Sequence, residues 1–291
     1  MNSKCNYKHL SLIITLLLTI LFSSHTLAQS DSIDQAQFVV IYDFQINTTD
    51  KNGNAAKDSM QWAVVVGSHV AKCTEFNRVM GEDFGEWKEY GLGEFNARKY
   101  NLPVIFVGYP DGEISSFDKV VPNRYFYTEP LPDFGWKLMD DTLTVGGYLC
   151  QKAVGKYAGR TWTAWYSEEV AASFGPWKLR GLPGMILKAE DKDGIFLFDC
   201  VGLIKRSAPI KYFSREEHTT LKRNKFIAHR NKILCDKKYV KQPNYYIPQG
   251  ISVIEMWGGG PEPSADEKLS VVSYDMVIPK KANVYQPLEL E

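Results

Sequence analysis

The chain is poor in the residue types that most often mark catalytic and metal sites. Only three of its five histidines, His69, His218 and His229, lie beyond the apolar N-terminal stretch. It has no Gly-x-Ser-x-Gly elbow, no Cys-x-x-Cys pair and no Gly-x-x-x-x-Gly-Lys-Ser/Thr phosphate loop. We therefore expect no catalytic residues, no metal site and no cofactor, so the sequence favours a non-enzyme. A hydrolase whose site is assembled from scattered Asp, Glu and His is the alternative.

An excess of one charge is also missing from the chain as a whole. It has 34 Lys and Arg against 34 Asp and Glu, so its composition gives no reason to expect nucleic acid as a partner. Residues 205–241 are the exception, because they contain twelve basic and only three acidic side chains. This basic stretch is either a solvated helix face or a surface for an anionic partner such as lipid or lipopolysaccharide.

Long apolar runs are absent except near the N-terminus. Lys4 and Lys8 precede the apolar residues 10–22, and Thr26-Leu27-Ala28 resembles a cleavage site. Residues 1–28 are therefore predicted to be a signal peptide. No other run approaches the roughly 20 apolar residues that span a bilayer. We expect residues 29–291 to form one exported domain without a transmembrane span, in the periplasm or at the outer membrane.

Alternating apolar residues predict a β-rich chain. In residues 37–47 an apolar side chain occurs at every second position from Phe38 to Ile46, and Trp62, Val64 and Val66 repeat this pattern. Turn residues separate further short strands, which are predicted at 104–109, 114–121, 124–128, 136–139, 142–145, 251–257 and 269–278.

Two hairpins are predicted around turns that contain glycine. Residues 148–154 and 160–166 flank the loop 155–159, and a symmetric register places Cys150 opposite Ala164. In the second hairpin, Asp191 to Gly194 form the turn. Its symmetric register gives one apolar face, formed by Met185, Leu187, Ala189, Phe196, Phe198 and Cys200. Cys150 and Cys200 either face one another as a disulfide or are buried thiols, and their spacing leaves both readings open.

One long helix is predicted over residues 214–239. Ser214 and Glu217 have the spacing of a capping box, and apolar residues from Phe226 to Leu234 recur at helical intervals. The predicted fold is thus α+β and β-rich, with a single curved antiparallel sheet and at least one long helix.

Residues 160–190 gather three tryptophans with Gly-Pro-Trp and Gly-Leu-Pro-Gly turns. Aromatic rings and rigid turns of this kind either form a ligand or partner site or pack the core and steer the chain. Trp165 is predicted to lie on the face opposite Trp162 and Tyr166. The candidate binding residues are Trp165, Tyr166, Trp177, Gly181, Leu182, Pro183 and Gly184.

These motifs resemble the signature of the GLPGLI family, which consists of secreted proteins found mainly in Bacteroidetes bacteria. Met185-Ile186 takes the place of the final Leu-Ile in the family name. Further matching segments are Tyr148–Ala153, Gly159-Arg160, Ala164–Tyr166 and the ending Tyr285–Glu291, where Gln286 replaces an Asn. The resemblance implies export, but no activity and no catalytic residues. A weaker resemblance, to periplasmic lipoprotein carriers, implies a half-barrel sheet that holds acyl chains.

The leading functional hypothesis is a non-enzymatic envelope protein. It would bind an apolar or amphiphilic ligand, or act as an accessory to an outer-membrane protein. A structural or interaction protein without a small ligand is a further alternative. A carrier requires an apolar cavity, an enzyme requires titratable groups that converge in a cleft, and an interaction protein requires an exposed patch or sheet edge.

Overall fold

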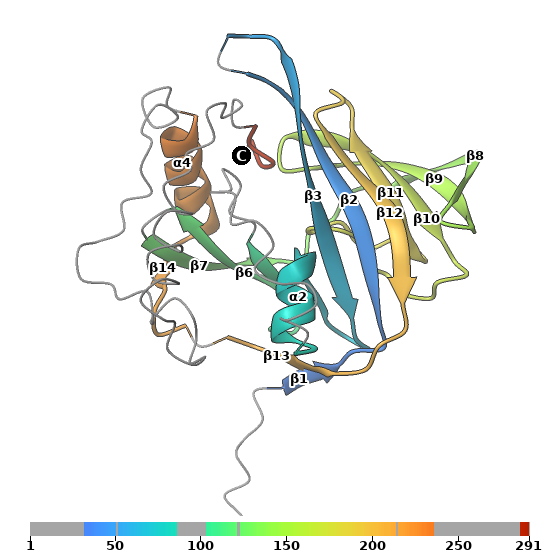
Figure 1. Ribbon diagram of the computed structural model, residues 1–291, viewed down its shortest axis with the longest axis horizontal. Coiled ribbons are helices and arrows are strands. Elements are labelled where there is room, and N and C mark those ends of the chain that lie inside the picture. The colour runs from blue at the N-terminus through green and yellow to red at the C-terminus, as the bar shows by residue number, and fades with distance from the viewer. Residues whose placement is uncertain are drawn as a thin grey trace, which may run out of the picture.

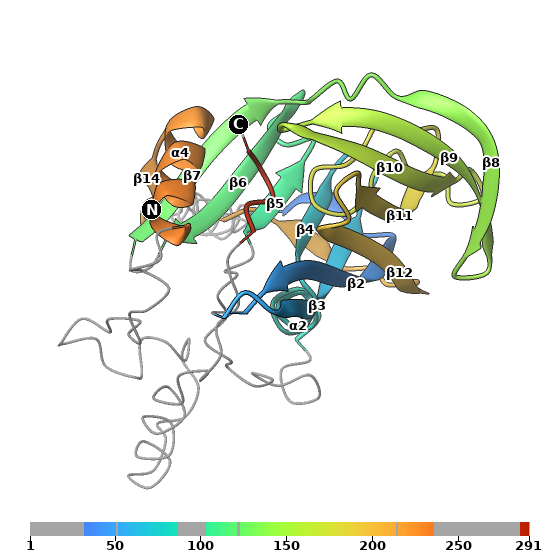
Figure 2. The same cartoon turned by 90° about the horizontal axis from the view of Figure 1, so that it is seen from above.

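One large β-sheet dominates the computed structural model, which describes residues 32–50, 52–85, 103–120, 123–213, 215–235 and 286–290. The 12 strands of this sheet lie in the order β14-β7-β6-β5-β4-β3-β2-β12-β11-β10-β9-β8. All neighbours are antiparallel except β14 and β7. The sheet bends strongly without closing into a barrel, and β1 and β13 pair separately (Figures 1 and 2).

The described elements follow the chain with short connections. The strands are β1 (Ser32–Gln35), β2 (Phe38–Thr49), β3 (Ala55–Val66), β4 (Ala71–Glu75), β5 (Val104–Val107), β6 (Glu113–Val120), β7 (Asn123–Pro130), β8 (Lys137–Val145), β9 (Tyr148–Tyr157), β10 (Arg160–Ser167), β11 (Met185–Asp191), β12 (Phe196–Ile204), β13 (Pro209–Lys211) and β14 (Thr219–Thr220). The helices are α2 (Phe76–Glu82) and α4 (Arg223–Leu234). Among the described residues, neither helix is long and apolar enough to cross a membrane.

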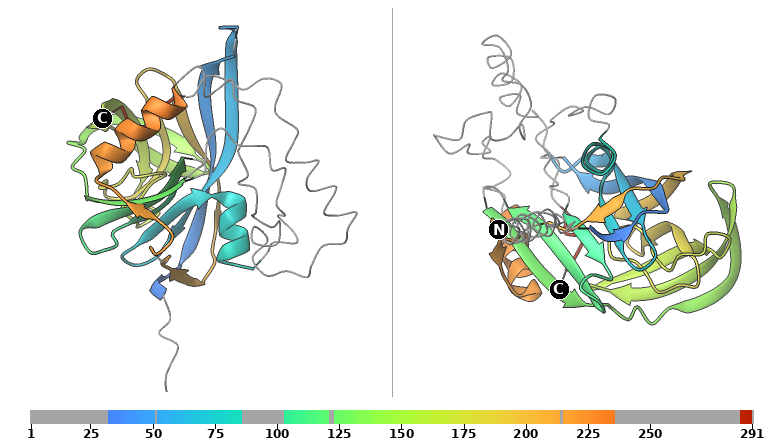
Figure 3. Two further views of the ribbon diagram at one scale, coloured as in Figure 1. Left: turned by 90° about the vertical axis from the view of Figure 1, so that its left-hand side faces the viewer. Right: turned by 90° about the horizontal axis from the view of Figure 1, so that it is seen from below.

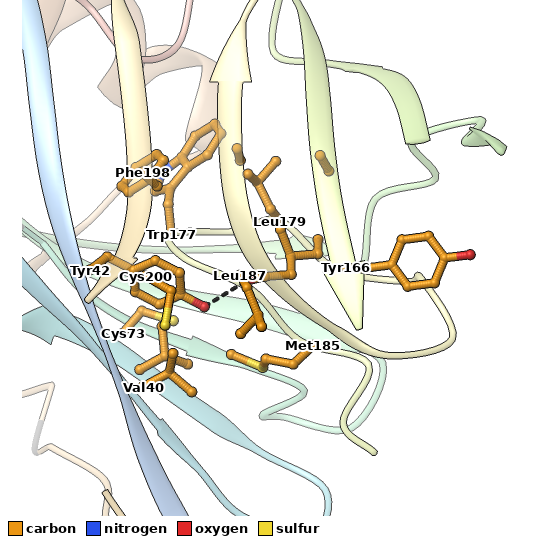
Figure 4. Close-up of a cluster of buried hydrophobic side chains, with 14 of the residues drawn as sticks. Val40, Tyr42, Cys73, Tyr166, Trp177, Leu179, Met185, Leu187, Phe198 and Cys200 are labelled. Carbon is orange, nitrogen blue, oxygen red and sulfur yellow. Dashed lines mark hydrogen bonds between the residues drawn. The ribbon is translucent and has the colours of Figure 1, made fainter. Parts of the chain in front are cut away.

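The side chains of β2 show how the sheet is covered. Tyr42, Phe44 and Ile46 are buried on what we call the inner face, as the alternating pattern predicts. Val39 and Ile41 are also buried, because α2 and residues near Ile210 cover the opposite, outer face of this part of the sheet. The inner face is filled by large side chains that include Trp62, Trp162, Trp177, Phe196 and Phe198 (Figure 4).

The two predicted hairpins are present, and their registers differ in an instructive way. In β11 and β12, Ala189 pairs with Phe198, two residues away from the symmetric register. A shift of two preserves the face of every side chain, so the predicted apolar face is confirmed as buried. In β9 and β10, Ala164 pairs with Ala153, so the predicted pairing with Cys150 is wrong. The turn there is only Ala158-Gly159, whose positive φ angles of 53° and 77° are those of a two-residue hairpin turn.

The predicted helix is shorter than expected. It begins at Arg223, and the capping box around Ser214 is not its start. Thr219 and Thr220 instead pair with Tyr125 and Phe126 of β7 as the short strand β14, which suits β-branched residues. The predicted strands at 251–257 and 269–278 and the predicted signal peptide lie outside the described residues.

Candidate functional site

Trp177 and its neighbours form part of the packed interior. Trp177 is 2% exposed, has a φ of +58°, and packs its ring 5.4 Å from Tyr157 and 5.7 Å from Trp162. Leu182 is also buried. Gly184 lies against the backbone of Ser167, where an added Cβ would be 2.1 Å from the carbonyl oxygen. These three candidate residues therefore shape the fold.

The other candidates are divided between the two faces and the surface. Trp165 is half-buried on the outer face, 5.7 Å from the Lys152 ammonium, so its predicted orientation is confirmed. Tyr166 is buried and donates a hydrogen bond to the Gln151 carbonyl oxygen. Gly181 and Pro183 are exposed. The structure therefore does not gather the seven candidates into one site.

A buried cluster of charges lies beside this block instead. Lys178 follows Trp177 directly and is fully buried. Its ammonium donates to Glu129 at 2.5 Å, to Glu289 at 2.7 Å and to the Tyr127 hydroxyl at 3.2 Å. We call Lys178, Glu129, Glu289, Tyr127 and Arg223 the clasp.

Arg223 joins helix α4 to the clasp. Its guanidinium lies 3.0 Å from Glu129 and 2.9 Å from Glu289. Tyr157, at the end of β9, donates to the second oxygen of Glu129 at 2.6 Å. The clasp therefore connects β7, β9, the Trp177 segment and α4.

The segment 286–290 supplies Glu289 and lies between α4 and the β9–β10 hairpin (Figures 2 and 3). Arg160 donates to the carbonyl oxygens of Pro287 at 2.7 Å and Leu288 at 3.2 Å. The Leu290 amide donates to the Ala158 carbonyl, and the Asn231 side chain donates to the Glu289 carbonyl.

The electrostatics of the clasp suit binding rather than proton transfer. Burial alone would lower the pKa of Lys178, but the adjacent Glu289 and the other anionic or acidic groups raise it well above its ordinary value. Burial would raise the pKa of Glu289, but Lys178, Arg230 and Arg223 hold it below its ordinary value. Burial also raises the pKa of Tyr127 and Tyr157. A lysine that stays protonated cannot act as a nucleophile or general base, so the clasp lacks an activated catalytic group.

Sequence reasoning did not identify the clasp. Lys178 lies within a quoted motif and Glu289 within the quoted ending, but 111 residues separate them. The available signal was that three quoted motifs contain residues of one contact network: Arg160, Lys178 and the ending. A lysine placed between Trp177 and Leu179, in a segment rich in turn residues, was a second signal.

Helix α4 has two distinct cationic faces. On its buried face, Arg223 joins the clasp and Arg230 lies 3.2 Å from the buried Asp118. On its exposed face, Lys222, Lys225 and Lys232 recur at intervals that place them along one stripe, which we call the lysine face. The helix has no acidic residue, and no carboxylate within the described ranges forms an ion pair with these three lysines.

The described edge strand β8 is exposed over almost its whole length. Leu138, Met139 and Leu143 are at least 38% exposed. The pairing with β9 is irregular between Leu138 and Thr142, where Asp140 and Asp141 lie. Bulges and charges of this kind protect sheet edges against further pairing. The edge thus combines apolar side chains with a device that opposes strand addition.

The cysteines are free thiols in the structure. Cys73, Cys150 and Cys200 are buried and Cys235 is exposed, so the disulfide alternative for Cys150 and Cys200 does not correspond to the structure. The odd shift of the β9 register removed the basis for placing Cys150 opposite Ala164. Burial raises the pKa of Cys150 to about 11, which keeps this thiol unreactive at neutral pH.

We expect one rapidly reacting thiol, Cys235, in the native protein without residues 1–28. In denaturant without reductant, all four thiols should react with a chromogenic disulfide reagent, because none is oxidised. A Cys235→Ser control should lose only the fast phase. Detection of only two thiols in denaturant would show that a disulfide forms.

Comparisons with known proteins give a limited likeness. No family model matches the chain, and no curated protein sequence matches it. Two crystal forms of PNGF-II, in space groups P21 and C2, are similar with TM-scores of 0.44 and 0.40 and identities of 16% and 17%. The matches cover 66% and 65% of this chain but only 32% and 31% of PNGF-II, so the chain aligns with about a third of that protein.

Proposed function

We propose that this chain is a non-enzymatic binding protein of the cell envelope. Its ligand is an amphiphile with phosphate groups, either an anionic phospholipid or lipopolysaccharide, and the lysine face of α4 binds the headgroup. One observation carries this proposal: the arginines of α4 are neutralised by buried carboxylates, whereas Lys222, Lys225 and Lys232 point away from them and are exposed. Anionic headgroups attract such a cationic stripe.

The packing of the inner face favours a surface site over an enclosed one. In the analogy with lipoprotein carriers, an acyl chain would lie against the sheet. The rings of Phe44 and Phe198 instead stack at 4.2 Å, and Trp62 packs edge-on against both. A lipid is therefore expected to contact the described part of the chain through its headgroup.

The titratable groups support a binding role rather than hydrolysis. Lys178 and Glu289 converge, but they neutralise one another in the interior. A hydrolase requires a base or nucleophile in its reactive protonation state within reach of substrate. Export and membership of the GLPGLI family are part of the same proposal, and they rest on the N-terminal pattern and on the motifs around Gly181–Ile186.

Vesicle binding tests the proposal. The protein without residues 1–28 should co-sediment with phosphatidylcholine vesicles that contain about 30% phosphatidylglycerol, and much less with phosphatidylcholine alone. Each lysine near an anionic surface contributes about 1 kcal/mol, so the triple variant K222Q/K225Q/K232Q should bind roughly 100-fold more weakly. Binding should also decrease as salt increases.

A matched control separates the lysine face from total charge. The variant K137Q/K156Q/K192Q removes the same charge from exposed lysines on β8, on β9 and in the β11–β12 turn, and it should bind nearly as well as the original protein. Equal losses in the two triple variants would overturn the proposal. A parallel set of vesicles with lipopolysaccharide in place of phosphatidylglycerol identifies which phosphate source binds more tightly.

A further inference from the structure

We propose that Arg160, Lys178 and Arg223 form a binding site for an extended acidic peptide of another protein chain. In this structure residues 287–290 of the same chain fill that site. The peptide class is defined by a glutamate between two apolar residues, as in Leu288-Glu289-Leu290. This inference is independent of the lysine face and goes beyond the proposed function.

The first argument is that the site contacts peptide backbone as well as side chain. Arg160 donates to two successive carbonyl oxygens, those of Pro287 and Leu288. Asn231 donates to the next carbonyl oxygen, and the Ala158 carbonyl accepts the amide of Leu290 at 3.0 Å. Main-chain contacts of this kind hold an extended peptide whatever its sequence.

The second argument is a pocket that selects a carboxylate. The Glu289 side chain is 2% exposed, with one oxygen 2.7 Å from Lys178 and the other 2.9 Å from Arg223. Two cations from different elements thus bind the two oxygens of one carboxylate. A glutamine at this position would lose the charge and leave both cations short of an anion in a buried place.

The third argument is that the site is held in shape by partners other than the peptide. Arg160 lies 2.8 Å from the buried Asp191, and Lys178 and Arg223 both contact Glu129. These anchors would keep the three cations in position if residues 287–290 left. Lys178 and Arg223 would then share only Glu129, and this excess of buried positive charge is matched by one incoming carboxylate.

A labelled peptide, Tyr-Gln-Pro-Leu-Glu-Leu-Glu, tests the site in the full mature chain. The variant Glu289→Gln weakens the chain's own segment as a competitor while preserving its shape. Fluorescence anisotropy should show that this variant binds the labelled peptide at least about tenfold more tightly than the original protein does. A peptide with Gln in place of its central Glu should bind at least about tenfold more weakly.

Two further variants decide whether the named residues form the site. In the E289Q background, Arg160→Met should abolish peptide binding, whereas Lys192→Met, at an exposed turn, should leave it unchanged. If E289Q is too unstable to use, the peptide should raise the melting temperature of that variant, and the Gln peptide should not. Equal affinity for the Glu and Gln peptides, or peptide binding that survives Arg160→Met, would overturn the proposal.

Discussion

Replacing Gly184 by alanine should lower the free energy of unfolding by about 3 kcal/mol or more, the upper end of the cost of overpacking. The new Cβ would lie 2.1 Å from the Ser167 carbonyl oxygen and 2.5 Å from the Ser167 carbonyl carbon. These are backbone atoms, so no side-chain rotation relieves the clash. The strand β11, which begins at Met185, would have to move away from its neighbours. Urea denaturation followed by tryptophan fluorescence measures the loss.

Gly194 provides the matched control for this substitution. It has a φ of +66° in the turn between β11 and β12, with open space where a Cβ would be built. Gly194→Ala should therefore cost only the left-handed backbone penalty, about 1–2 kcal/mol. Similar losses in the two variants would mean that backbone conformation, rather than the contact with Ser167, explains the glycine at position 184.

Lys178→Met should lower the free energy of unfolding by about 3–5 kcal/mol, which is the usual cost of removing one partner from a buried ion pair. Methionine fills most of the volume but leaves Glu129 and Glu289 with Arg223 as their shared cation. The exposed Lys192→Met is the control, and it should change stability by no more than about 0.5 kcal/mol. A small effect of Lys178→Met would show that Arg223 alone satisfies both carboxylates.

The same cluster predicts a pH dependence with a defined sign. The pKa of Glu289 is held below its ordinary value of 4.5. Its contribution to stability is therefore fully present above pH 4.5 and is lost as the pH falls through the lower, folded-state pKa. The stability difference between the original protein and Glu289→Gln should be constant near neutral pH and shrink below about pH 4.5. A difference that grows on acidification would contradict this assignment.

Local pattern was sufficient to predict most of the sheet. The alternation from Phe38 to Ile46 predicts β2, and the two hairpins follow from their turn residues. Register was predictable only by parity. A two-residue error at Ala189 preserved every face, whereas a three-residue error at Ala164 reversed the face assigned to Cys150.

The clasp could not be derived from local pattern. Lys178 and Glu129 are 49 residues apart, and Lys178 and Glu289 are 111 apart, so no periodicity relates them. Burial of a lysine also runs against its ordinary preference for water and becomes favourable only when its partners are in place. The helix start was missed for a similar reason, because pairing of Thr219 with Tyr125 depends on a strand nearly a hundred residues earlier.

The bond between Tyr157 and Glu129 has a mechanical consequence for the bent sheet. Seven strands separate β7 from β10 in the order of the sheet, and β9 lies one strand further. The hydroxyl of Tyr157 nevertheless lies 2.6 Å from a carboxylate oxygen on β7. The clasp therefore acts as a tie between the two arms of a curved spring. The curvature of the sheet is held by a few charged side chains as well as by its ladder of hydrogen bonds, and a force on one arm is transmitted to the other directly.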